Sequence, residues 1–233
     1  MAVDSNSFMV EKTCPICGQT TRVIKSKSRL VVESRDEDLC VHYKGFNPYF
    51  YRIWICEHCG FAADESTFTS PMPNKYREKL QEFLKHKDLE IEFTETRTLP
   101  DAVASFIMAL AYLDIINGPA SKKASYNLNM AWLYRFTGEY QEEEKHLRLA
   151  AELFDESLAK ERYPIGGLSD MAAIYLIGAI YYRLGNIEKC TQYLSKIIED
   201  KDLRTREPKV FDKARDLWAD IRANKKKSAP KKK

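Results

Sequence analysis

The pattern of apolar and polar residues changes about a third of the way along the chain. Residues 13–63 place β-branched and aromatic residues in short runs, as in 21–34 and 49–55, which is typical of strands. Asn47-Pro48 between these runs predicts a turn. From Lys75 onward apolar residues recur every three or four positions, which predicts amphipathic helices. We therefore expect a mainly α fold with a small N-terminal β region.

Turn and capping residues divide the helical part of the chain. Asn117-Gly118-Pro119, Gly138 and Gly185 are stop signals, Ser169 is a helix cap, and Pro208 suits a first helical turn. The predicted helices are a short one around 80–84, then 100–116, 121–137, 141–160, 169–185 and 187–199, and one that starts at 208. Helices joined by short turns predict stacked helical hairpins.

An internal repeat supports this arrangement. Gly138 aligns with Gly185 at a shift of 47 residues, and Met130-Ala131 then aligns with Ile177-Gly178. A small residue in the first helix and a glycine at the turn match the pattern of tetratricopeptide (TPR) repeats, in which small residues let two helices approach closely. Residues 101–118 would be at best a degenerate third repeat. The pattern predicts a TPR-like array of helical hairpins.

Two CxxCG sequences lie in the β region, and we call them the first and second knuckle. They are Cys14-Pro15-Ile16-Cys17-Gly18 and Cys56-Glu57-His58-Cys59-Gly60. Four thiolates are the number that a tetrahedral zinc ion takes in a closed structural site. We expect a zinc-ribbon-like segment with one structural zinc ion bound by Cys14, Cys17, Cys56 and Cys59. The 38 residues between the knuckles exceed the commoner spacing of about 15–20, which predicts a longer hairpin or an inserted loop.

Other interpretations of the cysteines stay open. Cys-Pro-Ile-Cys by itself resembles a thiol–disulfide redox motif, although the βαβ context of such proteins is missing. A catalytic zinc ion would need an open coordination position, which four cysteines close. The sequence has no phosphate-binding loop, dinucleotide fingerprint, GxSxG or HExxH motif. We therefore expect a protein that is not an enzyme.

Cys40 and His42 lie between the knuckles and add two further ligand types. In one interpretation Cys40 packs under the ribbon and His42 lies at the surface or orients a metal ligand. In the other, Cys40 is a metal ligand, either in place of a knuckle cysteine or in addition to the four, or it is a redox-sensitive thiol beside the zinc ion. Both interpretations stay open at this point.

Charge is unevenly distributed along the chain. The net charge is +3, but six of the 37 Lys and Arg residues are lysines within residues 225–233, and the remaining 31 face 34 acidic residues, a net charge of −3. We expect a disordered Lys-rich tail at 225–233. Pro71-Met72-Pro73 suggests a boundary between a zinc-ribbon-like β domain (1–70) and a TPR-like helical domain (71–224).

The sequence gives no sign of a secretory signal, and its longest apolar run is well short of the ~20 residues that span a bilayer. We therefore expect a cytoplasmic protein that does not contact a membrane.

Binding of single-stranded nucleic acid is an alternative function. Four basic residues, Arg22, Lys25, Lys27 and Arg29, precede an aromatic-rich segment that could stack on bases. Residues 1–75 carry nine basic and nine acidic side chains, so four zinc-bound thiolates would make the segment negative. We therefore consider nucleic acid a less favoured partner.

The knuckle region carries a resemblance to a known family. Besides the CPxCG sequence it contains an Asp-rich stretch with Cys40, the sequence Tyr-Lys-Gly-Phe-Asn-Pro at 43–48, and Trp-Ile-Cys-Glu-His-Cys-Gly-Phe-Ala-Ala at 54–63. This arrangement resembles an uncharacterised bacterial family, a domain of unknown function, with a TPR-like helical region. The resemblance covers most of residues 12–220. It implies a zinc-binding N-terminus and a cytoplasmic location, and it implies no activity.

Our first functional hypothesis is a non-enzymatic zinc protein whose TPR-like scaffold binds an unidentified protein or peptide. The repeat register places six side chains on the concave face: Asn129, Trp132, Arg135, Tyr175, Tyr182 and Arg183. Two arginines beside aromatic residues suit an acidic or C-terminal carboxylate ligand. Alternatively, these side chains pack against the loop after Asp155 or the last helix. A nucleic-acid-binding ribbon and a cytosolic thiol-redox protein are the other candidate functions.

Overall fold

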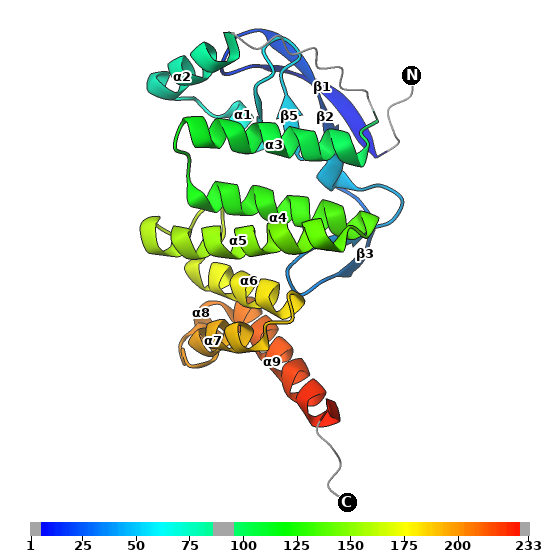
Figure 1. Cartoon of the computed structure of the whole chain (residues 1–233), viewed down its shortest axis with the longest axis vertical. Helices are drawn as coiled ribbons and strands as arrows, with labels where there is room; N and C mark the ends of the chain where they lie inside the picture. Colours follow the sequence, from blue (N-terminus) through cyan, green and yellow to red (C-terminus); the bar gives the residue numbers. More distant parts are fainter. Residues whose placement is uncertain (1–5, 86–95, 229–233) are drawn as a thin grey trace, which may run out of the picture.

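The computed structural model describes residues 6–85 and 96–228, and it places a small group of strands against one end of a stack of helices (Figure 1). Within these residues the fold is mainly α, as expected. The strands are β1 (Ser7–Thr13), β2 (Thr20–Ser26), β3 (Val32–Arg35), β4 (Val41–Tyr43), β5 (Ile53–Ile55) and β6 (Ala62–Asp64), with a 3₁₀ turn η1 at Pro48–Tyr51. The helices are α1 (Glu65–Thr69), α2 (Asn74–Lys85), α3 (Leu99–Ile115), α4 (Ala120–Thr137), α5 (Tyr140–Lys160), α6 (Asp170–Arg183), α7 (Ile187–Ile198), α8 (Leu203–Arg206) and α9 (Pro208–Ser228).

The described strands form three separate antiparallel hairpins. β1 pairs with β2 so that Thr13 faces Thr20, and the first knuckle is the loop between them. β5 pairs with β6 so that Ile55 faces Ala62, and the second knuckle is the loop of this hairpin. β3 and β4 form a third hairpin in the long spacer between the knuckles. The extra length, expected to form a longer hairpin or an inserted loop, thus contains a separate hairpin.

The strand expectation differs from the structure at two places. β1 begins at Ser7, ahead of the predicted start of the β region at residue 13. Residues 48–51 form the 3₁₀ turn η1 and not a strand, because Pro48 fixes a turn-like φ and the side chain of Asn47 accepts a hydrogen bond from Tyr49 N at 3.0 Å. Two short helices, α1 and α8, were not expected either.

The helices α3 to α6 lie one below another, and α9 extends away from the far end of the stack (Figure 1). The pairs α4/α5 and α6/α7 are helical hairpins whose turns contain Gly138 and Gly185, with positive φ of 77° and 71°. In the second pair Gly178 faces α7 so closely that an added Cβ would lie 3.3 Å from Leu194 Cδ2. The small residue that the repeat predicts at this position therefore permits close packing of α6 on α7.

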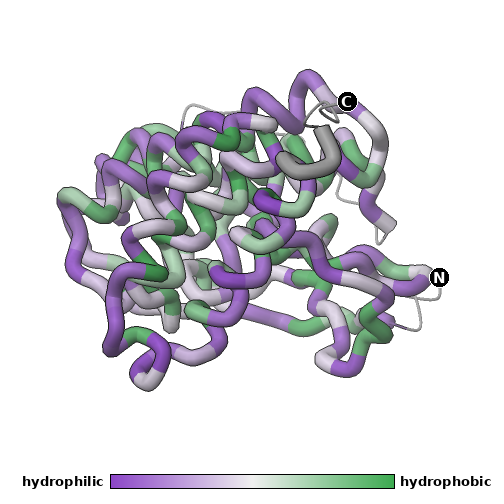
Figure 2. Tube along the Cα trace, turned by 90° about the horizontal axis from the view of Figure 1, so that it is seen from below, coloured by the Kyte–Doolittle hydropathy of each residue, from purple (hydrophilic) through white to green (hydrophobic). Residues whose placement is uncertain are grey.

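The hydrophobic core runs without interruption from the cysteine knuckles to α9. Apolar and polar residues alternate along the helices, as Figure 2 shows in a view from below. Helix α9 continues to Ser228 and so includes the first four residues of the segment predicted as a tail, while residues 229–233 lie outside the described residues. None of the helices in the described ranges is both long and apolar enough to cross a membrane.

Candidate metal centre

The two knuckles have the same backbone geometry. In the first, Gly18 N donates to Cys14 O at 3.0 Å and Cys14 N donates to Gln19 O at 2.9 Å. The equivalent distances in the second, from Gly60 N to Cys56 O and from Cys56 N to Phe61 O, are 2.9 and 2.8 Å. Both glycines have a positive φ, 75° and 76°, which a residue without a Cβ adopts at little cost.

These loops bring the four sulfur atoms of Cys14, Cys17, Cys56 and Cys59 together. Cys14 Sγ lies 3.7 Å from Cys59 Sγ, Cys17 Sγ lies 3.6 Å from Cys56 Sγ, and all four atoms lie within 4.8 Å of one another. Four sulfurs at ~2.3 Å from a zinc ion would stand ~3.8 Å apart at the corners of a tetrahedron. None of the four is in a disulfide. The cluster could therefore hold a metal ion.

Helices of the stack hold both knuckles in place. On α2, Gln81 Nε2 donates to Ile16 O of the first knuckle at 2.7 Å. On α3, the hydroxyl of Tyr112 donates to Gly60 O of the second knuckle at 2.9 Å, and its ring stacks on Phe61 with 5.8 Å between centroids. Thr21 also joins the two hairpins, because its hydroxyl oxygen accepts from Glu57 N at 3.1 Å.

The close contact of the thiols shifts their pKa values in opposite directions. Hydrogen bonds from Cys14 and Cys59 lower the pKa of Cys56 well below its usual range. The hydrogen bond between Cys14 and Cys56 is the main reason that the pKa of Cys14 rises to about 12. Hydrogen bonds with Cys14 and Cys56 raise the pKa of Cys59. A divalent cation would favour deprotonation of all four cysteines, because metal binding at cysteines displaces protons.

Cys40 and His42 do not belong to this cluster. They form a second group with Asp36, in which the three candidate ligand atoms lie within 4.8 Å. Asp36 Oδ2 is 2.9 Å from His42 Nε2 and 2.6 Å from the guanidinium of Arg135. Cys40 is fully buried, which raises its pKa above the usual range. Because Asp36 already accepts from two donors and the guanidinium would repel a cation, this group is better described as an ion-pair network than as a metal site.

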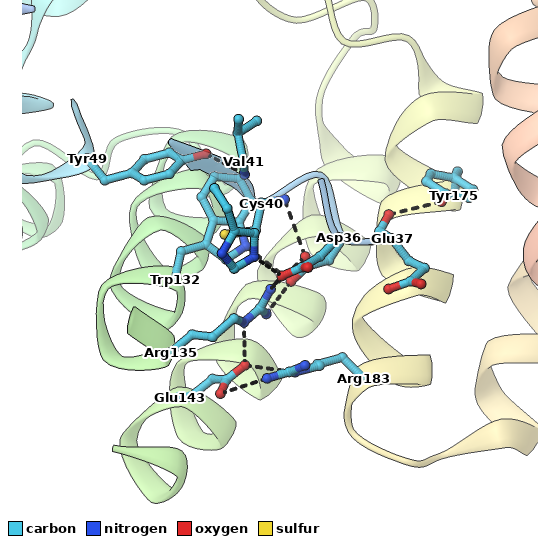
Figure 3. A network of polar contacts seen from close by, with 12 residues as sticks. Asp36, Glu37, Cys40, Val41, Tyr49, Trp132, Arg135, Glu143, Tyr175 and Arg183 are labelled. Atoms are coloured by element: carbon cyan, nitrogen blue, oxygen red, sulfur yellow. Dashed lines mark hydrogen bonds and ion pairs between the residues drawn. The ribbon is translucent and has the colours of Figure 1, made fainter. Parts of the chain in front are cut away.

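The network joins the β3–β4 hairpin to the helices (Figure 3). We call residues 36–38, Asp-Glu-Asp, the acidic segment; it follows β3. Asp38 accepts from Arg135 Nη1 at 3.0 Å and Nη2 at 2.6 Å, and from Trp132 Nε1 at 3.1 Å. The hydroxyl of Tyr175 on α6 donates to the main-chain carbonyl of Glu37 at 2.9 Å. The acidic segment thus lies across α4 and α6.

The face predicted for an acidic partner is therefore covered in this structure. Trp132, Arg135 and Tyr175 each donate a hydrogen bond to the acidic segment. Arg183 pairs with Glu143 instead, at 3.0 Å. The other two residues of the predicted face are Asn129, which is 3% exposed, and Tyr182, which packs on the hydrophobic core. The acidic segment is the part of this site that the sequence reasoning overlooked, although its two aspartates were visible beside Cys40.

Several of the residues considered for nucleic-acid binding form ion pairs or are buried. Lys25 pairs with Glu65, and Arg22 pairs with Glu57 at 3.5 Å. Four of the aromatic side chains proposed to stack on bases are buried in the core: Phe46, Tyr49, Tyr51 and Trp54. Buried rings cannot serve as platforms for bases, so the geometry does not favour this alternative.

Together, fold and site define a class of mainly helical proteins with an N-terminal tetracysteine cluster. The chain belongs to the family described as "Uncharacterized protein conserved in bacteria (DUF2225)", which it matches over residues 8–221. The resemblance to an uncharacterised bacterial family is confirmed.

One curated relative is similar in sequence over part of the chain. It is an uncharacterized protein of Borreliella burgdorferi, 28% identical over 151 residues, a stretch that covers 54% of this chain and 52% of the relative. The match thus spans about half the length of that relative. No solved structure matches the chain.

Proposed function

We propose that this is a non-enzymatic, cytoplasmic zinc protein in which one structural ion fixes the N-terminal hairpins to a TPR-like scaffold for protein–protein interaction. The observation that carries the proposal is the spacing of the four sulfurs, 3.6 and 3.7 Å for the two measured pairs. This spacing fits a tetrahedral set of thiolates, which leaves no position open for a substrate or a water nucleophile.

The ion would act by joining short hairpins that have little stability alone. β5 and β6 have three residues each, and an isolated two-stranded hairpin is at best marginally stable in water. Cys14 and Cys59 come from different hairpins, as do Cys17 and Cys56. A bound ion would therefore cross-link the two hairpins at the point where α2 and α3 contact them.

The helical hairpins support the scaffold part of the proposal. α4/α5 and α6/α7 repeat the same turn glycine at a shift of 47 residues, and Gly178 lies close to α7, as a TPR-like pair would require. Repeat arrays of this kind present extended faces to which peptides bind.

Replacement of a cluster cysteine tests the proposal. Cys56→Ser should abolish stoichiometric zinc binding and lower the midpoint of thermal unfolding, because three thiolates no longer close the site. Cys190→Ser is the matched control, since Cys190 is equally buried but lies on α7 outside the cluster. It should keep one zinc ion per chain. Equal zinc content in both variants would contradict the proposal.

A further inference from the structure

The acidic segment makes the contacts that a bound peptide would make. Three consecutive residues, 36–38, supply two carboxylates and one main-chain carbonyl, and receive donors from three side chains on two helices. Both terminal nitrogens of Arg135 engage Asp38, at 3.0 and 2.6 Å, which is the bidentate geometry of carboxylate recognition. The groups that the helices bind therefore come from three consecutive residues, as they would in a short peptide motif.

The receiving face is held in position by groups outside the acidic segment. Glu143 on α5 accepts from Arg135 Nε at 2.7 Å and from Arg183 Nε at 3.0 Å. This contact fixes the Arg135 side chain from the side opposite to the segment, so its two terminal nitrogens stay directed toward a carboxylate (Figure 3). A preformed donor pair of this kind loses little entropy when it binds an anion.

The face also contains an acceptor that the acidic segment leaves unused. Asn129 lies one turn before Trp132 on the same side of α4 and is 3% exposed. Its Nδ2 donates to Ser125 O at 2.6 Å, whereas its Oδ1 has no hydrogen-bond partner among the described residues. A buried acceptor without a donor is unfavourable, because it has lost its hydrogen bonds to water.

The hairpin that carries the acidic segment is strained at one residue and exposed along one strand. Leu39, the residue after the acidic segment, has a φ of 71°, which is unfavourable for a side chain with a Cβ. All four residues of β3 are exposed, and its pairing with β4 contains a register shift between Val32 and Ser34. Local opening of such a hairpin costs less than opening of the helical stack.

We propose that the face of α4 and α6 formed by Trp132, Arg135 and Tyr175 is a binding site for an acidic peptide, and that residues 36–38 occupy it as an intramolecular ligand. An acidic segment of a partner protein would displace the chain's own segment. This inference deepens the proposed scaffold function and rests on it, since it names the chemistry of the partner and the element that competes with it.

Competition between the internal segment and an added peptide tests the proposal. The probe is a fluorescent peptide Arg-Asp-Glu-Asp-Leu, which copies residues 35–39, and the control peptide replaces its three acids with Asn, Gln and Asn. The double variant Asp36→Asn, Asp38→Asn weakens the internal ligand but leaves the receiving side chains unchanged. It should bind the acidic probe at least about tenfold more tightly than the unaltered protein does, a difference of ~1.4 kcal/mol. Adding Arg135→Gln to this double variant should abolish binding of the acidic probe.

A second measurement covers the case in which the double variant does not fold. In the unaltered protein, a saturating concentration of the acidic probe should accelerate hydrogen exchange at the amides of Cys40 and Val41, which now donate to Asp38 and Tyr49. The control peptide, in which amides replace the acids, should leave the exchange at these amides unchanged. Equal binding of both peptides, or no binding and no change in exchange, would overturn the proposal. Zinc content measured on the same samples separates this failure from failure of the zinc proposal.

Discussion

At Arg135, one guanidinium contacts carboxylates from two distant parts of the chain. Its side chain is 6% exposed and lies within 2.7 Å of Asp36, Asp38 and Glu143. Desolvation opposes the charged form, but the hydrogen bond and charge of Asp38 outweigh it and raise the pKa of Arg135 above its usual range. The neighbouring carboxylates therefore stabilise the charged form of Arg135.

Arg135→Gln should be strongly destabilising. It would leave Asp38, which is 2% exposed, without its cation, and Glu143, which is 3% exposed, with Arg183 as its remaining cation. Removal of one partner from a buried ion pair costs about 3–5 kcal/mol. Urea unfolding of the zinc-loaded protein measures this loss.

Arg148→Gln is the matched control. Arg148 pairs with Glu144 on the surface of α5, with both side chains more than half exposed. Exposed pairs of this kind contribute at most about 0.5 kcal/mol. A loss of similar size in both variants would contradict the account of the network.

Sequence reasoning identified Arg135 as part of a carboxylate-binding face but expected an external ligand. The reason is the separation: Asp36 and Arg135 are 99 residues apart, and no local pattern relates them. The four cysteines, in contrast, could be predicted because each CxxCG unit is a local motif and its glycine fixes the turn that aims both sulfurs.

At the scale of elements, the long helices were predictable and the short elements were not. The predicted helices 121–137 and 141–160 agree to within one residue with α4 (Ala120–Thr137) and α5 (Tyr140–Lys160). The apolar periodicity and the turn at Gly138 made these helices recognisable. Helices α1 and α8 have five and four residues, too few for a periodic pattern. The aromatic run 49–55 looked like one strand, but Pro48 and the cap at Asn47 turn its first part into η1.

Gly138→Ala should test the turn of the first helical hairpin. Gly138 has a φ of 77°, and an added Cβ would meet no atom within 4 Å, so the cost comes from the backbone alone. We expect a loss of about 1–2 kcal/mol in the free energy of unfolding. Gly138→Asn should cost less, because asparagine tolerates this conformation better. Equal losses in the two variants would show that the turn is not left-handed.

Asp64 should give part of the stability a predictable pH dependence. It caps α1 through Thr67 N and pairs with Lys122 on α4 at 2.7 Å. Burial alone would raise the pKa of Asp64, but the Lys122 ammonium lowers it below the usual value of 3.8. A group whose pKa is lowered by folding stabilises the protein above that value, and the contribution is lost as the pH falls through its pKa in the folded state.

The comparison of unaltered protein with Asp64→Asn isolates this contribution from the protonation of other groups. The difference in free energy of unfolding should be constant between pH 5 and pH 7 and should shrink as the pH falls below about 4. Urea titrations at each pH measure it. A difference that grows at low pH would contradict the assignment.

At the scale of the whole molecule, the long spacer between the knuckles connects the cysteine cluster to the middle of the helical stack (Figure 1). It begins and ends at the cysteine cluster, and its β3–β4 hairpin reaches α4 and α6 of the helical stack (Figure 1). A sequence-based boundary near residue 71 therefore divides a chain whose hydrophobic core is continuous. The boundary between two domains stays a prediction.

The most direct test of the central claim is native mass spectrometry of the protein purified without a chelator. The account predicts one zinc ion per chain, with Cys14, Cys17, Cys56 and Cys59 protected from alkylation until zinc is removed. Two results would contradict it: a chain without metal whose knuckle cysteines react freely, and a chain without metal whose mass is lower by two hydrogens for each disulfide formed.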